Sequence, residues 1–89
     1  MIRMLTLFQV EDFAKWKVGF MEAASLRTAA GAKSAQAFQQ TENSKMVVVV
    51  TEWESLEKAK SFSQSPALRE AQQKSGVLGK PEIYELKSM

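Results

Sequence analysis

The run at residues 46–53, Met-Val-Val-Val-Val-Thr-Glu-Trp, constrains the fold of this chain more than any other feature. Four consecutive β-branched valines favour a strand, because branching at Cβ restricts side-chain rotamers in a helix. A strand with one solvated face alternates apolar and polar residues, whereas residues 46–50 are apolar throughout. We therefore expect a strand that is covered on both faces, and an all-helical fold is disfavoured.

The stretch 10–29 has the three- and four-residue periodicity of a helix with one apolar face. Glu11 and Asp12 are expected in its first turn, where carboxylates favour the positive end of the helix dipole. Gly31 is expected to end it. The apolar stripe consists of Val10, Phe13, Trp16, Phe20, Ala23 and Ala24.

The remaining segments complete an α+β order. Strands are predicted at 2–8, 33–40 and 82–87, with a hairpin connection at 41–45. Helices are predicted at 55–63 and 66–75, because Ser65 and Pro66 form a typical helix start. This is the ferredoxin-like β-α-β-β-α-β order, a four-stranded antiparallel sheet with the helices on one face. Residues 1–89 are thus expected to form one domain.

The chain has no spare element to cover the second face of the sheet. A domain of 89 residues buries a modest fraction of its surface, and small domains are often stabilised by disulfides, metals or association. The sequence has no cysteine and no histidine, which leaves association. We expect a homodimer joined through the sheet faces.

Charge and composition exclude several classes of protein. The 12 basic and 10 acidic residues are interspersed, which argues against a nucleic-acid-binding arm. Phe38 alone does not make the aromatic pattern of an RNA-recognition sheet. No run of 18 apolar residues and no secretion signal is found, so cytoplasm is the default expectation. No phosphate-binding glycine loop and no metal site is expected, and no cofactor is implied.

The candidate site residues are aromatic and polar. Trp16, Phe20, Trp53 and Tyr84 are candidates for an apolar pocket between sheet and helices, or for simple core packing, which is favoured for Phe20. A further candidate is Arg27, as an anion anchor or as a satisfied helix-end arginine. Glu52 could accept a hydrogen bond from Arg27 or from a substrate, and Tyr84 could hold an oxyanion.

Several segments together resemble a known family. These are Thr51-Glu-Trp-Glu-Ser-Leu-Glu57, the later Ser65-Pro66, the run from Val10 to Phe20, and the ending from Gly76 to Ile83. They are similar to antibiotic-biosynthesis-monooxygenase-like proteins of the dimeric α/β-barrel superfamily.

The resemblance implies two sheets packed face to face across a dimer axis, with a pocket between helices and sheet in each subunit. Members include cofactor-free oxygenases of quinol-like aromatics, heme-degrading enzymes, polyketide cyclases and proteins without known activity. Many carry a histidine three residues before the serine-proline pair, where this chain has Phe62. Because the sequence has no histidine, it departs from the family pattern, which argues against heme degradation and excludes proton transfer by histidine.

The hypothesis from sequence is a homodimer that binds a small aromatic or polyketide-like molecule and oxygenates it without a cofactor. The alternative is a non-catalytic structural or regulatory homodimer whose interior is filled by its own side chains. An open pocket favours the first hypothesis and solid packing favours the second.

Overall fold

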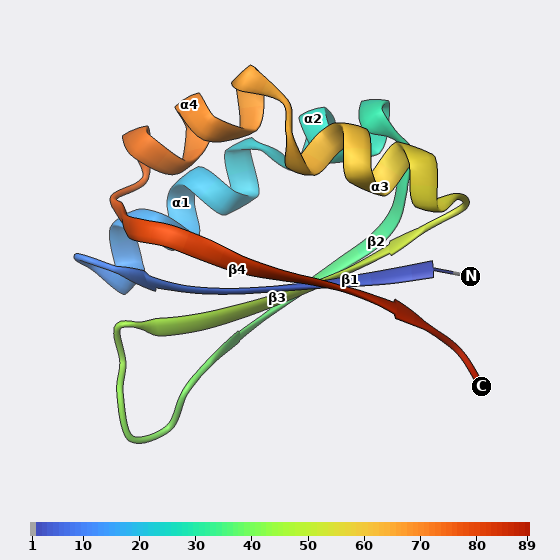
Figure 1. Ribbon diagram of the computed structural model, residues 1–89. Coiled ribbons are helices and arrows are strands. Elements are labelled where there is room, and N and C mark those ends of the chain that lie inside the picture. Colours follow the sequence, from blue (N-terminus) through green and yellow to red (C-terminus); the bar gives the residue numbers. More distant parts are fainter. Residues whose placement is uncertain (1) are drawn as a thin grey trace.

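The computed structural model describes residues 2–89. Its strands and helices alternate as the sequence predicts, with each predicted helical region divided into two helices (Figure 1). The elements are β1 (Ile2–Val10), α1 (Phe13–Glu22), α2 (Ala24–Ala30), β2 (Ala32–Gln39), β3 (Met46–Trp53), α3 (Leu56–Ser63), α4 (Pro66–Lys74) and β4 (Val77–Lys87).

The four strands form one antiparallel sheet in the order β2-β3-β1-β4. All four helices lie on the same face of this sheet (Figure 1). The α+β ferredoxin-like fold predicted from the sequence is therefore confirmed. Within residues 2–89, no helix is long and apolar enough to cross a membrane.

The first helical region starts later than predicted and is broken. Asp12 is extended, with φ −149°, and its carboxylate accepts hydrogen bonds from the backbone N–H groups of Ala14 (2.9 Å) and Lys15 (3.3 Å). Asp12 is thus the cap before α1 rather than part of its first turn. The helix ends at Ala23, and α2 continues to Gly31, whose φ of 112° closes it as predicted. No glycine or proline marks the break at Ala23.

The second helical region agrees with the prediction. The Ser55 hydroxyl accepts a hydrogen bond from the N–H of Lys58 and caps α3. The Ser65 hydroxyl does the same for Leu68 at the start of α4, where Pro66 occupies the first turn. Serine caps and an N-terminal proline thus divide this region into two helices.

The last strand is longer than the predicted 82–87 and contains a bulge. Leu7 of β1 pairs with Glu82, whereas Gln9 pairs with Leu78, so residues 79–81 lie opposite a single residue of β1. Gly79 has φ 68°, a conformation that glycine adopts without strain. Gly79 and Pro81 were expected to precede the last strand, but the bulge accommodates both within β4.

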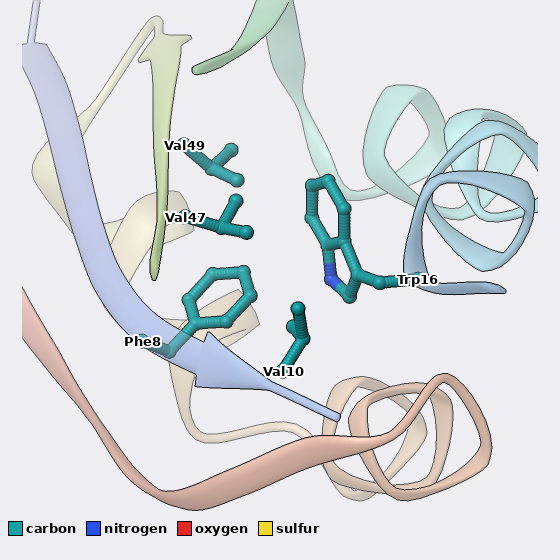
Figure 2. Close-up of a cluster of buried hydrophobic side chains, with 5 residues drawn as sticks. All are labelled: Phe8, Val10, Trp16, Val47 and Val49. Atoms are coloured by element: carbon teal, nitrogen blue, oxygen red, sulfur yellow. The ribbon is translucent and has the colours of Figure 1, made fainter. Parts of the chain in front are cut away.

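Two clusters of buried side chains fill the space between helices and sheet. The first gathers around Trp16, which reaches from α1 onto β1 and β3 (Figure 2). The second gathers around Trp53 beneath α3. The buried members of the first are Phe8, Val10, Trp16, Val47 and Val49, and those of the second are Met4, Trp53, Ala59 and Phe62.

The opposite face of the sheet is apolar and carries no helix within residues 2–89 (Figure 1). Val47 and Val49 point to the helices and are buried, whereas Val48 and Val50 on the other face are only partly buried. We call this second surface the outer face. Its large exposed side chains include Phe38, Leu78, Tyr84 and Leu86, which are 43–50% exposed.

Candidate functional site

A cavity of about 80 Å³ lies between the helices and the sheet, where the two buried clusters meet. Inward side chains of β1 and β3 form its floor, and all four helices contribute to its walls. It is lined by Met4, Thr6, Phe8, Trp16, Gly19, Phe20, Ala23, Arg27, Val49, Thr51, Phe62, Leu68, Ala71, Gln72, Ser75 and Ile83.

One wall of the cavity is a stack of aromatic rings. The rings of Trp16 and Phe20, one helical turn apart on α1, have centroids 5.0 Å apart and an interplanar angle of 27°. The Trp16 ring also lies 5.5 Å from that of Phe8 on β1, which helps to fix its orientation. The guanidinium of Arg27 lies over the Phe20 ring, with its Cζ 3.9 Å from the ring centroid. This cation–π contact ties α2 to α1 across the break at Ala23.

Arg27 is the only ionisable residue among those that line the cavity. Burial lowers the pKa of Arg27 from its ordinary value, because the guanidinium loses part of its hydration. Within residues 2–89 its guanidinium takes part in no salt bridge and no hydrogen bond. It lies in the last turn of α2, where the helix dipole favours a cation, and none of the residues that line the cavity is acidic. The side chain can therefore receive an anionic group from a ligand.

The other polar groups of the cavity differ in availability. Thr51 Oγ1 accepts a 2.7 Å hydrogen bond from Trp53 Nε1, and Ser75 Oγ donates to the Ala71 carbonyl at 2.8 Å. Both hydroxyls are thus already engaged. The side chains of Thr6 and Gln72 make no hydrogen bond within the described part of the chain, so they remain free to contact a ligand.

Three of the sequence-predicted site residues do not line this cavity. Trp53 is fully buried in the second cluster, with its ring 5.3 Å from that of Phe62. Glu52 and Tyr84 lie on the outer face, because successive strand residues point to opposite sides. Glu52 contacts Arg3 at 3.4 Å, not Arg27.

The sequence reasoning omitted the floor of the cavity. Met4, Thr6 and Phe8 alternate along β1, and Val49 and Thr51 alternate along β3. The available signal was the period of two, together with threonines at inward positions that are otherwise apolar. Phe62, where the family resemblance implies histidine in many members, also lines the cavity.

Comparison with known proteins agrees with this architecture. The family profile of antibiotic biosynthesis monooxygenases matches residues 3–74. No curated protein matches the chain.

Solved structures share the fold at low sequence identity. A candidate antibiotic biosynthesis monooxygenase from Bordetella bronchiseptica is 18% identical, with a TM-score of 0.86 over 99% of this chain and 96% of that chain. The cofactor-independent oxygenase SnoaB from Streptomyces nogalater is 11% identical, with a TM-score of 0.77 over 98% of this chain and 91% of that chain. These likenesses establish the fold, and the match of the family profile over most of the sequence shows that the chain belongs to the antibiotic biosynthesis monooxygenase family.

Proposed function

We propose that the protein binds a hydroxylated aromatic molecule in this cavity and oxygenates it without a cofactor. The observation that carries the proposal is Arg27, an unpaired cation at the wall of an otherwise uncharged cavity. The stacked rings of Trp16 and Phe20 make the wall beside it apolar. An aromatic ring against this surface would place its ionised hydroxyl near Arg27. The similarity to SnoaB, a cofactor-independent oxygenase, supports the same reaction class.

The reaction needs only the substrate and oxygen. For 1-naphthol, the anion transfers electron density from the carbon para to the hydroxyl into O2, and a C–O bond forms as a hydroperoxide. Loss of water then leaves a carbonyl at that carbon. The sum is one naphthol and one O2 giving one 1,4-naphthoquinone and one water, so the substrate itself supplies all four electrons that reduce O2.

The protein's contribution is orientation and electrostatics. Arg27 would stabilise the substrate oxyanion, and the apolar walls would exclude water from the reacting carbon. No carboxylate, lysine or tyrosine is among the residues that line the cavity. The hydroxyl proton is therefore expected to leave to solvent, and the rate should rise with pH according to the pKa of the substrate.

The cavity volume limits the substrate. Pockets that enclose drug-sized ligands measure roughly 300–1,000 Å³, whereas this one measures about 80 Å³. Only part of an aromatic molecule fits unless side chains move. The small volume also favours the alternative of a non-catalytic homodimer whose interior is nearly filled, so activity has to be measured directly.

The test is oxygen uptake with 1-naphthol and formation of 1,4-naphthoquinone in a one-to-one ratio. We expect Arg27→Gln to lower the turnover rate by about 10²-fold, the usual cost of losing an oxyanion-stabilising group. The matched control is Arg3→Gln, which removes an arginine on the outer face. Uptake that is absent in the wild type, or unchanged in Arg27→Gln, would contradict the proposal.

We further propose that two copies associate through their outer faces. The exposed apolar side chains gather on this side of the sheet, and the family resemblance implies the same arrangement. Burial of such a face against its own copy removes apolar area from water and covers the partly exposed Val48 and Val50.

A further inference from the structure

We propose that the groove between α4 and the bulge of β4 is a second subsite, which binds a carboxylate on the far end of the same substrate. The substrate class would then be a hydroxy-aromatic carboxylate. This inference rests on the proposed function, because the aromatic ring itself is placed in the cavity beside Arg27.

The volumes motivate a second subsite. A buried cavity of roughly 150 Å³ is known to hold a single benzene ring, whereas the cavity beside Arg27 measures about 80 Å³. A bound aromatic must therefore extend beyond it. The groove between α4 and β4 has about 360 Å³ of space and opens to solvent.

The groove adjoins the cavity. Gln72 of α4 and Ile83 of β4 line both spaces. The Gln72 amide is free of hydrogen bonds within the described residues, and it can reorient to admit a ligand. The bulge at residues 79–81 shapes the other side of the groove.

The charges of the groove select an anion. Arg69 and Lys80 line it, and neither takes part in a salt bridge within residues 2–89. No carboxylate is among its lining residues. A carboxylate at this place would therefore meet two cations and no like charge.

A second groove beside the cavity, between α1 and α4, is less suited to an anionic substrate. It carries both signs of charge, and its Lys74 is already paired with Glu70 at 3.4 Å. Gly19 and Ser75, which line both this groove and the cavity, pack closely, since a Cβ on Gly19 would lie 2.7 Å from the Ser75 Cβ. The groove at β4 thus remains the better path for an anionic substrate.

The test compares 1-naphthol with 5-hydroxy-1-naphthoate, which adds a carboxylate to the second ring. Dissociation constants would be measured by titration calorimetry at pH 7 and low salt. We expect the wild type to prefer the carboxylate by roughly fivefold, as two solvent-exposed ion pairs allow. In Arg69→Gln/Lys80→Gln the preference should fall to about one, with the affinity for 1-naphthol unchanged.

The control is Lys15→Gln/Lys74→Gln, which removes the same charge from the groove between α1 and α4. It should keep the preference, and a loss equal to that in Arg69→Gln/Lys80→Gln would overturn the inference by showing a general charge effect. Equal wild-type affinities, with 1-naphthol binding still dependent on Arg27, would overturn this inference alone. Failure of both ligands to bind would overturn the proposed function as well.

Discussion

At the scale of single residues, Arg27 is a partly buried cation whose proposed role is to bind a ligand. It loses hydration at the cavity wall, and in return it gains a cation–π contact with Phe20 and the dipole of α2. No salt bridge compensates within residues 2–89. Under the proposed function, an anionic ligand would offset the cost of this partial desolvation.

We therefore expect Arg27→Met to leave the free energy of unfolding unchanged or raised. The lost cation–π contact, about 0.5–1 kcal/mol, is offset by removal of the desolvation cost. The folded pKa of Arg27 is lowered but an arginine stays protonated in both states throughout pH 5–9, so its effect on stability should not vary with pH there. Urea denaturation at pH 5, 7 and 9 measures this, and a loss above about 1 kcal/mol would assign Arg27 a structural role.

At the scale of the elements, two broken helical regions cover the cavity and meet closely at one point. Gly19 of α1 lies against Ser75 at the end of α4. Both residues line the cavity, so the spacing of these helices sets its width. Glycine in a helix ordinarily costs about 1 kcal/mol relative to alanine, and here the close approach explains its presence.

Gly19→Ala should consequently destabilise the protein, by about 1–3 kcal/mol, although alanine is the better helix former. The added Cβ would lie 2.7 Å from the Ser75 Cβ and push α1 away from α4. Thermal unfolding of Gly19→Ala, Ser75→Gly and the double variant forms a cycle that isolates this contact. Recovery of stability in the double variant is expected, and a Gly19→Ala protein more stable than wild type would disprove the steric reading.

Most of the elements were predictable because each has a local cause. The run of valines predicts β3, and the serine caps predict the starts of α3 and α4. The break at Ala23 has no such local mark. Gly79 and Pro81 do mark the bulge in β4, but these residues also fit a loop before a shorter strand, and the pairing with β1 decides between the two. The face on which Tyr84 lies was not predictable in the same way, because it follows from the register of β4 against β1.

The candidate site was predictable only in its helical part. Trp16, Phe20 and Arg27 share one side of a helical region, and the structure brings them together in one stack. Glu52 and Tyr84 were expected beside them, but an offset of one residue along a strand places a side chain on the opposite face. Trp53 lies on the inner face, where it packs against Phe62. Unlike Phe62, Trp53 does not line the cavity.

At the scale of the whole molecule, the sheet has one covered and one uncovered face. The molecule has two layers, with the helices on one face of the sheet (Figure 1). Along β3, only the side chains on that inner face are fully buried. The outer face presents Leu78, Tyr84 and Leu86 of β4 along with Phe38 of β2. Soluble proteins seldom leave such a contiguous apolar surface exposed, so association is the expected outcome.

We expect Leu86→Lys/Phe38→Lys to convert a dimer into a monomer without unfolding it. Both side chains are exposed in the single chain, so charges there should leave its own packing intact, while two charged residues facing their own copies oppose association. Light scattering after size-exclusion chromatography gives the mass, and circular dichroism checks the fold. Met21→Lys, at an exposed apolar position on α1, is the control and should remain dimeric. A wild-type monomer at high concentration would refute the arrangement.

The bulge in β4 also interrupts an open edge of the sheet. β4 is an edge strand, and an open edge offers unpaired N–H and C=O groups to any extended chain. At the bulge, Pro81 has no N–H to donate and Lys80 adds a charge, so an incoming strand cannot pair along the full edge. Although the outer face is apolar, this edge therefore resists the growth of a continuous β-fibril.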